Sequence, residues 1–482
     1  MRINLQEPKY TVPITILITV IVSLLFGQII TGFSYKIALV LALGTLIFIV
    51  TLVNTDAGLF ILIFSMLLSP EIILGRIPGR DVVVRIDDFL LAVITFAWLA
   101  KTAIYKGLAL FVKTPLNKII GIYAFLCLIS TLRGIVLGYV VPVKGFFYVA
   151  RYIEYFLLFI LVANQIHSRK QIKVFLAAFF IVCALVSAYG MLQIPSGIRV
   201  SAPFEGKQGE PNTFGGYLLF ILCIAIGIYL QDVSPRLKRA LLALSALIIF
   251  PFFYTLSRAS YVAIIFSFLA FIVLSKKKVI LVSVMTVLIL AGIMIKPEAI
   301  LSRVKYTFQE KQAHLAKIGN IYLDPSSSER IFSWRESFQA WQKDPLLGRG
   351  VTGFHFIDGQ YIVLLPELGI LGFLAFLWLL WSILKHSLGI LNQMHELDDE
   401  LYKGLTLGFI TGFIGLAFHA ITANTFIIIR IMEPFWFFAA IIMMLPTLKK
   451  GEYEQEKQDR GINPIRRMEP KIMSTRSRST AV

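Results

Sequence analysis

The sequence predicts an all-α integral membrane protein that crosses the bilayer many times and carries one large loop on the outer side. Hydrophobic residues make up 57% of the 482 residues and charged residues only 15%, whereas soluble domains average about 45–50% and about 25%. The mean hydropathy is +0.78. Apolar runs of roughly 20 residues, the length of a bilayer crossing, recur along the chain. These observations exclude a secreted disulfide scaffold, a disordered chain and a set of ordinary soluble domains.

The apolar runs predict about 12–14 transmembrane helices. Arg2 and Lys9 precede the first run, which is long and lacks a small-x-small cleavage site, so we expect a retained first helix and not a cleaved signal peptide. Very short links at 54–56 and 257–258 each join two apolar runs. One of these helix pairs could enter and leave the membrane on the same side, and the chain would then have twelve crossings. The predicted crossings lie near 13–31, 37–53, 57–74, 88–105, 119–138, 145–166, 174–192, 214–230, 240–256, 259–274, 279–295, 362–384, 404–422 and 425–446.

The basic residues predict the orientation of these helices. The chain has 46 Lys and Arg against 28 Asp and Glu, a net charge of +18, but most basic residues lie in short segments between apolar runs. They therefore indicate topology, and no nucleic-acid partner is expected. The basic segments 101–118, 169–173, 236–239 and 276–278 fall on one side with the tail, which predicts a multi-pass protein of the cytoplasmic (inner) membrane with both termini in the cytoplasm.

This topology divides the chain into four parts. Residues 1–295 are expected to form about eleven transmembrane helices with short loops. Residues 296–361 form a large extracytoplasmic loop with membrane-surface helices, and residues 362–446 form the last three crossings. Residues 447–482 mix basic and acidic side chains, so we expect a disordered, basic cytoplasmic tail with mild attraction to anionic lipids.

The second half of the large loop predicts an amphipathic helix. The sequence Asp-Pro-Ser-Ser-Ser-Glu at 324–329 is typical of a helix start with serine as the N-cap. Arg330, Trp334, Phe338 and Trp341 then follow at spacings of four, four and three, which places them on one helical face. Such a helix is expected to lie on the membrane surface, either as part of a site or as a plain connector.

Several arginines lie inside or beside predicted crossings, where a charge costs roughly 2.5–3.5 kcal/mol on insertion scales. By the predicted topology all of them fall in the external half. A lone arginine is explained by snorkelling or by pairing with a nearby carboxylate, such as Glu154 for Arg151 or Glu433 for Arg430. Together they indicate an outward-facing site for a phosphate or diphosphate, which the guanidinium fork matches. The six arginines are Arg133, Arg151, Arg199, Arg258, Arg330 and Arg430. No His, Asp or Glu spacing predicts a metal site, and no cofactor is expected.

Five sequence pieces carry a family resemblance. They are E-P-N-T-F-G-G-Y-L at 210–218, T-L-S-R-A-S at 255–260, R-I-F-S-W-R-E-S-F-Q-A-W at 330–341, D-P-L-L-G-R-G at 344–350 and D-G-Q-Y-I-V-L-L-P-E-L-G-I-L-G at 358–372. In this order they resemble the bacterial O-antigen ligase and polymerase family, membrane glycosyltransferases that use undecaprenyl-diphosphate-linked glycans. The resemblance covers roughly residues 200–375.

The resemblance implies glycan transfer on the outer face of the cytoplasmic membrane, from an undecaprenyl-diphosphate-linked donor to a saccharide or lipid-core acceptor, within membrane lipids. It implies diphosphate binding by Arg258 and Arg330, with Arg133, Arg151, Arg199 and Arg430 as weaker candidates. Fixed arginines stabilise such a leaving group without a metal. Ligases of the family usually carry a histidine where this sequence has Asp358, and His355 lies three residues earlier. This departure favours an O-antigen or exopolysaccharide polymerase over a ligase.

Each candidate for the rest of the site has an alternative role. Asp358 is a candidate base for the acceptor proton or an N-cap for the helix that follows. Trp334 is expected to stack on a sugar or to anchor the membrane, and Glu367 to orient a sugar or to pack. A transporter or flippase for lipid-linked oligosaccharide is the competing function. That class predicts internal repeats and charges spread to the membrane midplane, whereas the charges here gather on the external side.

Overall fold

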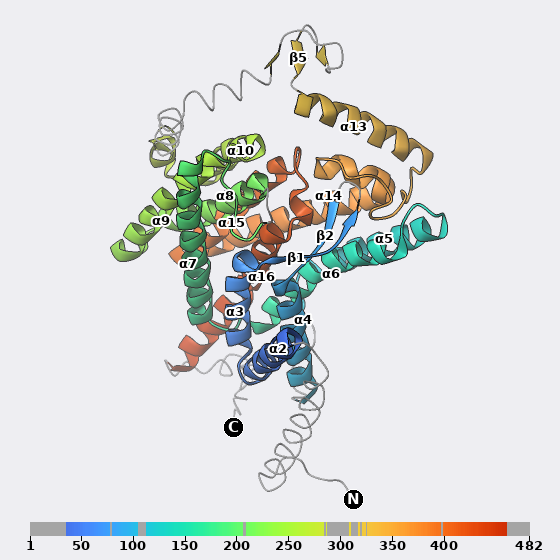
Figure 1. Cartoon of the computed structure of the whole chain (residues 1–482). Coiled ribbons are helices and arrows are strands. Elements are labelled where there is room, and N and C mark those ends of the chain that lie inside the picture. Colours follow the sequence, from blue (N-terminus) through green and yellow to red (C-terminus); the bar gives the residue numbers. More distant parts are fainter. Residues whose placement is uncertain are drawn as a thin grey trace, which may run out of the picture.

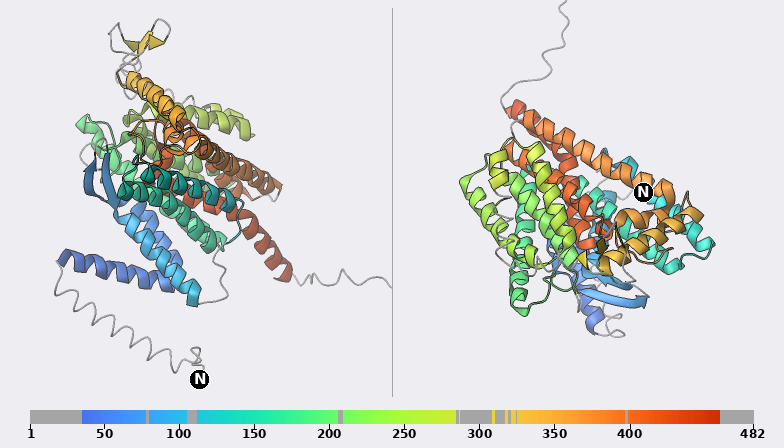
Figure 2. Two further views of the ribbon diagram at one scale, coloured as in Figure 1. Left: turned by 90° about the vertical axis from the view of Figure 1, so that its right-hand side faces the viewer. Right: turned by 90° about the horizontal axis from the view of Figure 1, so that it is seen from above.

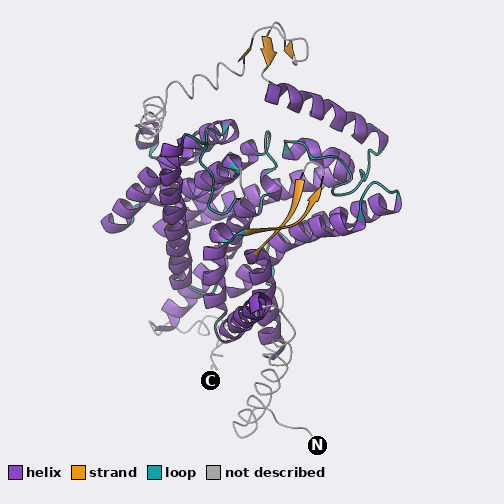
Figure 3. Ribbon diagram, in the orientation of Figure 1, coloured by secondary structure: helices purple, strands orange, loops and turns teal. Residues whose placement is uncertain are grey.

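The protein is a bundle of long helices (Figure 1). The computed structural model describes residues 35–77, 80–104, 112–205, 209–283, 286, 308–309, 317–318, 321–323, 325–396 and 399–459. Helices dominate this part of the chain (Figure 3), which confirms the all-α fold class. Among the described residues, eight helices are long and apolar enough to cross a membrane, and three more apolar helices are shorter. The chain is therefore a multi-pass membrane protein.

The described helices follow the predicted crossings closely. The crossing predicted at 13–31, and most of the one at 279–295, lie outside the described residues. The first half of the bundle contains α2 (Tyr35–Val53), α3 (Thr55–Leu68), α4 (Ile86–Ile104), α5 (Asn117–Val136), α6 (Pro142–Gln165), α7 (Arg169–Gln193) and the 3-10 turn η1 (Ile194–Ser196). The second half contains α8 (Pro211–Tyr229), α9 (Pro235–Tyr254), α10 (Arg258–Leu274), α13 (Pro325–Lys343), α14 (Gln360–Glu396), α15 (Glu400–His419), the 3-10 turn η2 (Thr425–Ile427) and α16 (Ile429–Asp459).

A β-hairpin stands where the sequence predicted the end of a crossing. The run predicted at 57–74 divides into α3, which ends at Leu68, and the strand β1 (Glu71–Ile77), which pairs antiparallel with β2 (Arg80–Arg85). Pro70 explains the division, because the residue before a proline disfavours helical backbone. The Ile- and Val-rich segments that follow favour strands. A small antiparallel sheet, in the order β3-β5-β4, precedes α13 and consists of β3 (Phe308–Gln309), β4 (Lys317–Ile318) and β5 (Ile321–Leu323).

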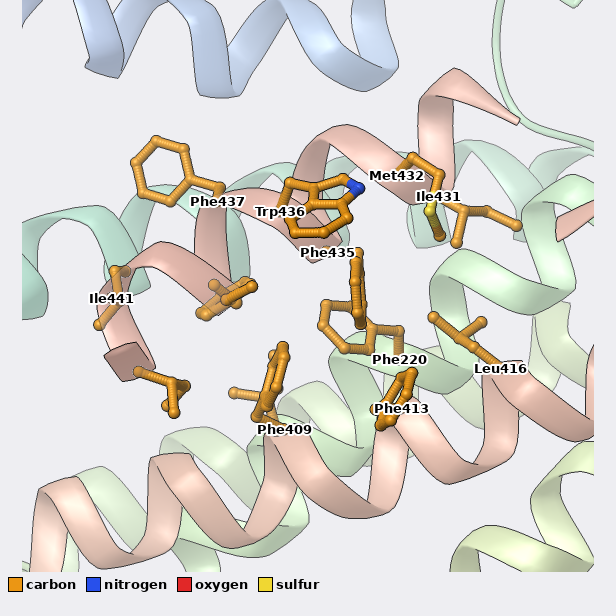
Figure 4. Packing of buried hydrophobic residues seen from close by; sticks show 14 of the residues in the cluster. Phe220, Phe409, Phe413, Leu416, Ile431, Met432, Phe435, Trp436, Phe437 and Ile441 are labelled. Carbon is orange, nitrogen blue, oxygen red and sulfur yellow. The ribbon is translucent and has the colours of Figure 1, made fainter. Parts of the chain in front are cut away.

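Two helices form the centre of the bundle. In the apolar windows of α8 and α16, 89% of the residues are buried, against 28% in α9, so α8 and α16 contact other helices on nearly all sides. Aromatic rings fill the space around them (Figure 4). Phe435 of α16 lies 5.8 Å from Phe220 of α8 and 5.4 Å from Phe409 of α15, measured between ring centroids. The core is therefore built around α16 and not around the N-terminal helices.

Glycines let α8 and α15 approach to backbone contact. A Cβ atom added to Gly227 would meet the backbone of Gly404 and Gly408, and one added to Gly408 would meet the backbone of Cys223 and Ile224. Glycine recurs every three or four residues in α15, a pattern that is typical of closely packed membrane helices. We call the contact of Gly227 with Gly404 and Gly408 the α8–α15 seam.

The connecting segments interact in two separate groups. In one, Arg169 and Lys449 both bind Asp399, and Lys277 binds Asp232. In the other, the hairpin β1–β2, the 194–210 loop and the start of α16 meet at Arg430, which donates to the carbonyl oxygens of residues 67, 69, 203 and 204. The helix α13 lies at the top of Figure 1, and Figure 2 confirms this from a second direction, whereas α16 runs towards the opposite end.

The last helix is longer than predicted. It starts at Ile429 and continues to Asp459, beyond the predicted end of the crossing at 446. The first part of the expected tail is therefore helical, and residues 460–482 lie outside the described residues.

Candidate active site

Arg330 of α13 forms an ion pair with Asp358, the residue that lies two positions before α14. Its Nε and Nη2 atoms lie 3.3 and 3.0 Å from Asp358 Oδ2. Trp334, one helical turn further along α13, donates from Nε1 to the carbonyl oxygen of Asp358 at 3.0 Å. The side chains of Arg330 and Asp358 are 21% and 43% exposed, so both are accessible from outside the protein. The helical face predicted to carry Arg330 and Trp334 thus holds Asp358.

The segment before this pair differs in detail from the prediction. The helix α13 begins at Pro325, ahead of the serines predicted as N-caps, and proline is well suited to a first helical position. His355 does not reach the pair by any described contact. Its Nε2 atom lies 3.5 Å from Glu336 Oε2, and both side chains are more than half exposed.

Arg258 is the first residue of α10, at the tip of the α9–α10 hairpin. Ser257 caps the helix and accepts a hydrogen bond from the amide of Ser260 at 3.2 Å. Arg199, from the loop after α7, holds the tip by donating from Nε to the carbonyl oxygen of Thr255 at 2.9 Å. Leu256 adopts a left-handed backbone with φ of 47°, which few non-glycine residues do. Two of the predicted arginines, Arg199 and Arg258, are thus brought to one hairpin.

Arg133 has a different neighbour. It binds Asp344 at 2.8 Å, and Arg349 binds the other oxygen of the same carboxylate at 3.2 Å. Burial opposes ionisation of Asp344, but the hydrogen bonds from Arg133 and Arg349 outweigh it and lower the pKa of this carboxyl group. This arrangement ties the end of α5 to the loop between α13 and α14.

That loop fills a break in α14. Gly369 has φ of 64° and ψ of −170°, which interrupts the helix three residues after Pro366. Non-helical backbone at membrane depth needs partners inside the protein. The amides of Arg349 and Gly350 donate to the carbonyl oxygens of Pro366 and Glu367, each at 2.8 Å.

The Glu367 side chain lies within this junction. Its carboxylate accepts from the amide of Thr352 at 2.9 Å, and the residue is only 7% exposed. Its contacts are those of a residue that fastens the loop to α14.

Arg151 and Arg430 lie in a buried cluster of charged residues that the sequence analysis did not predict. We call Glu71, Asp88, Arg151, Glu205 and Arg430 the buried cluster. Arg151 binds Asp88 at 3.2 Å. Arg430 lies 3.5 Å from Glu71 and 3.6 Å from Glu205 and is 2% exposed. Besides the charges already noted inside predicted crossings, the pair of acidic residues at 87–88, at the start of an apolar run, is a sequence signal for this cluster.

Glu205 is the buried carboxyl of this cluster that lies in a loop. Burial raises its pKa to about 8, against the opposing charge of Arg430. The carboxyl therefore holds its proton near neutral pH. Its Oε2 accepts from the amides of Ala202 and Glu210 at 3.2 and 2.9 Å.

The six predicted arginines therefore fall into four groups. Arg199 and Arg258 share a hairpin, Arg330 pairs with Asp358, Arg133 pairs with Asp344, and Arg151 and Arg430 lie in the buried cluster. Of these partners, only Asp358 was a predicted site residue. Within the described ranges, no three His, Cys, Asp or Glu side chains are arranged to hold a metal ion.

One sequence comparison points to a family. Residues 242–377 match a family model described as O-antigen ligase. The matched segment contains Arg258, Arg330, Trp334, Asp358 and Glu367, and it leaves out the buried cluster. No curated protein matches the chain. The resemblance stated from the motifs is thereby confirmed.

Proposed function

We propose, from the membership of residues 242–377 in the O-antigen ligase family, that this protein transfers glycan from an undecaprenyl-diphosphate-linked donor to a saccharide acceptor. The coarse class, an enzyme of the O-antigen ligase and polymerase type, follows from the family. The donor, the residues and the choice between polymerase and ligase are our proposal.

The pairing of Arg330 with Asp358 is the observation that carries this proposal. Both residues lie in family motifs and in the matched segment, they are in contact, and both are accessible. A guanidinium and a carboxylate side by side supply what the reaction needs, namely a cation for the leaving diphosphate and an acceptor for a proton.

The reaction is a single displacement. The acceptor hydroxyl oxygen attacks the anomeric carbon of the donor sugar, a new glycosidic bond forms, and the bond from that carbon to the diphosphate oxygen breaks. Asp358 takes the hydroxyl proton, and the lipid diphosphate leaves with the bonding electron pair. We assign Arg258 and Arg330 to the diphosphate, and Trp334 to contact with a sugar ring through its exposed face.

The remaining candidates receive supporting roles. Arg199 holds the hairpin of Arg258, and Arg133 fastens the loop that precedes Asp358. Arg151 and Arg430 are occupied by carboxylates and carbonyl groups of the protein, so we place them outside the diphosphate site. His355 remains a candidate second base on the exposed rim. A carboxylate at 358, where ligases of the family usually have histidine, leads us to favour a polymerase.

We further propose that the site faces outward from the cytoplasmic membrane, with both termini in the cytoplasm. The basic segments 169–173 and 276–278 lie in the group of contacts opposite to the site, as the positive-inside rule expects. In this arrangement residues 296–361 form the extracytoplasmic part.

The test is glycan transfer by the purified protein in lipid nanodiscs, with an undecaprenyl-diphosphate oligosaccharide as donor. We expect Arg258→Ala and Arg330→Ala to lose at least about a hundredfold in kcat, as for loss of a donor to a developing charge. Lysine at either position also performs poorly, because a point charge does not reproduce the forked contact. Arg236→Ala is the matched control, because Arg236 is exposed in the first turn of α9, at the end of the bundle opposite to the site. Full activity of the Arg258 and Arg330 variants would overturn the proposal.

The broken helix α14 also suits the alternative function. Discontinuous helices at a substrate site are a feature of secondary transporters. A flippase would move the lipid-linked oligosaccharide across a vesicle membrane without lengthening or transferring it. The same nanodisc reaction therefore separates the two, because a transporter yields no new glycosidic bond there.

A further inference from the structure

The turn between α15 and α16 contacts both halves of the proposed site. His419 ends α15, and residues 420–425 lead into η2. One end of this turn contacts the helix that begins with Arg258, and the other contacts the segment that contains Asp358. We call residues 419–425 the junction turn.

The first arm of the junction turn is His419. The residue is fully buried, its Nε2 atom lies 3.2 Å from Ser260 Oγ, and its Nδ1 atom lies 2.8 Å from Thr425 Oγ1. Ser260 Oγ in turn lies 2.9 Å from the Oγ atom of Ser257, the N-cap of α10. Arg258 stands between these two serines in the sequence. The imidazole therefore fixes the helix end from which Arg258 projects.

The second arm is Asn424. Its Nδ2 atom donates to the carbonyl oxygen of Ile357 at 2.7 Å, and the residue is 5% exposed. The amide of Gln360 donates to the carbonyl oxygen of Ala420 at 2.9 Å. Asp358, with Arg330 bound to it, lies between these two anchored positions.

We propose that His419 and Asn424 are positioning residues that set Arg258 at a working separation from the Arg330–Asp358 pair. The inference rests on the function proposed above. The two guanidinium groups come from α10 and α13, whose first residues, Arg258 and Pro325, are 67 positions apart in the sequence. Both are nevertheless anchored to one short turn. A misplacement of about 1 Å at a reacting centre can cost about a hundredfold in rate. A shift of the junction turn would displace Arg258 relative to the Arg330–Asp358 pair and would therefore lower the rate.

The alternative is that the two side chains only stabilise the fold. A buried hydrogen bond contributes to stability wherever it occurs, so loss of activity alone does not decide. Thr411→Val is the matched control. Thr411 is fully buried in the same helix, α15, but its hydroxyl donates to the carbonyl groups of its own helix at residues 407 and 408. The hydroxyl also faces the thiol of Cys223 in α8, and neither of these two helices carries Arg258 or Asp358.

The experiment measures kcat, KM for the lipid-linked donor and the melting temperature in parallel. We expect His419→Ala and Asn424→Ala to lower kcat by about 10-fold to 100-fold while the KM of the folded protein changes by less than about 3-fold. Thr411→Val is expected to lower the melting temperature to a similar extent and to leave kcat unchanged.

Conservative variants give a second readout. A glutamine amide extends about as far as imidazole Nε2, and an asparagine amide about as far as Nδ1. His419→Gln therefore keeps the contact with Ser260 and is expected to recover most of kcat, whereas His419→Asn keeps the contact with Thr425 and does not. Equal recovery by both variants would contradict the proposed link through Ser260.

Double variants test whether His419 acts through Arg258 and whether Asn424 acts through the Arg330–Asp358 pair. If His419 acts through Arg258, His419→Ala costs only about 2-fold to 3-fold in an Arg258→Lys background, and Asn424→Ala does the same in an Arg330→Lys background. Additive losses in both backgrounds would overturn the positioning role. If Arg258→Ala itself is fully active, the proposed function fails; if that variant is inactive but His419→Ala and Asn424→Ala keep full kcat, only the present inference fails.

Discussion

At the scale of single residues, the neighbours of an arginine decide what it can bind. Arg430 is 2% exposed and donates four hydrogen bonds to carbonyl groups of its own chain, which leaves it no approach for a ligand. Arg330 is partly exposed, and its bound carboxylate is still more exposed. Sequence position made both residues candidates, because both fall near the same predicted membrane boundary. Burial and partners distinguish them.

Glu205 gives a prediction for the pH dependence of stability. Its pKa of about 8 in the folded protein lies above the unfolded value near 4.5, so between these values the folded state binds the proton and the unfolded state does not. The free energy of unfolding therefore falls as pH rises from about 5 to 8. Glu205→Gln imitates the protonated group and keeps an acceptor for the amides of Ala202 and Glu210. We expect the melting temperature of the variant, relative to that of the parent, to increase as pH rises from 5 to 8.

The measurement is thermal unfolding in detergent at several pH values, taken as the difference between variant and parent. The charged groups around Glu205, which are Arg430, Glu71 and Glu210, are the same in both proteins, so their own titration largely cancels. A difference that does not change with pH, or one that shrinks as pH rises, would show that Glu205 is ionised in the folded protein.

At the scale of elements, the break in α14 is what seats the loop between α13 and α14. Two amides of that loop satisfy carbonyl groups released by the break, and the amide of Ile370 donates to Pro345 at 2.8 Å. The motifs at 344–350 and 358–372 are therefore two sides of one junction. The sequence located both but not their pairing, since a Pro and a Gly inside an apolar run are equally consistent with an unbroken, kinked helix.

Gly369 tests the importance of this break. Its positive φ is strained for other residues, and an added Cβ would meet the backbone of Leu346 and Leu347. Gly369→Ala is expected to destabilise the protein by about 1–3 kcal/mol and to lower transfer activity by displacing the loop that leads to Asp358. Gly121→Ala is the control, because nothing lies within 4 Å of a Cβ there. Equal stability of the two variants, measured by thermal unfolding, would show that the break tolerates a side chain.

At the scale of the whole molecule, apolar runs and charge bias predicted the helices and two distinct ends. They predicted neither the β1–β2 hairpin, the first strand of which begins inside the run predicted as a crossing at 57–74, nor the buried cluster. Arg430 meets carbonyl groups more than 200 residues away, and such long-range partners leave no local pattern. His419 gave no signal either, since a single histidine at the end of an apolar helix has no spacing to interpret.

The two ends give a prediction of sidedness. Cysteine introduced at His355 is expected to react with a membrane-impermeant maleimide in right-side-out vesicles, and cysteine at Arg236 only in inside-out vesicles. The native Cys127, Cys183 and Cys223 are buried and provide a silent background, which the unmodified protein checks. Labelling of the two positions in the opposite vesicles would place the candidate site in the cytoplasm.

Under the function proposed above, the α8–α15 seam limits where a glycan can enter and leave. At the seam the backbones of α8 and α15 touch through glycine, with no side chain between them that can move aside. We therefore expect this contact to stay closed. For the reaction proposed above, we therefore place the opening for the glycan elsewhere, on the rim formed by α13 and the loop that follows it. A covalent cross-link between that rim and α15 should stop turnover once bound product has been released. A cross-link between α8 and α15 at the seam should leave turnover unchanged.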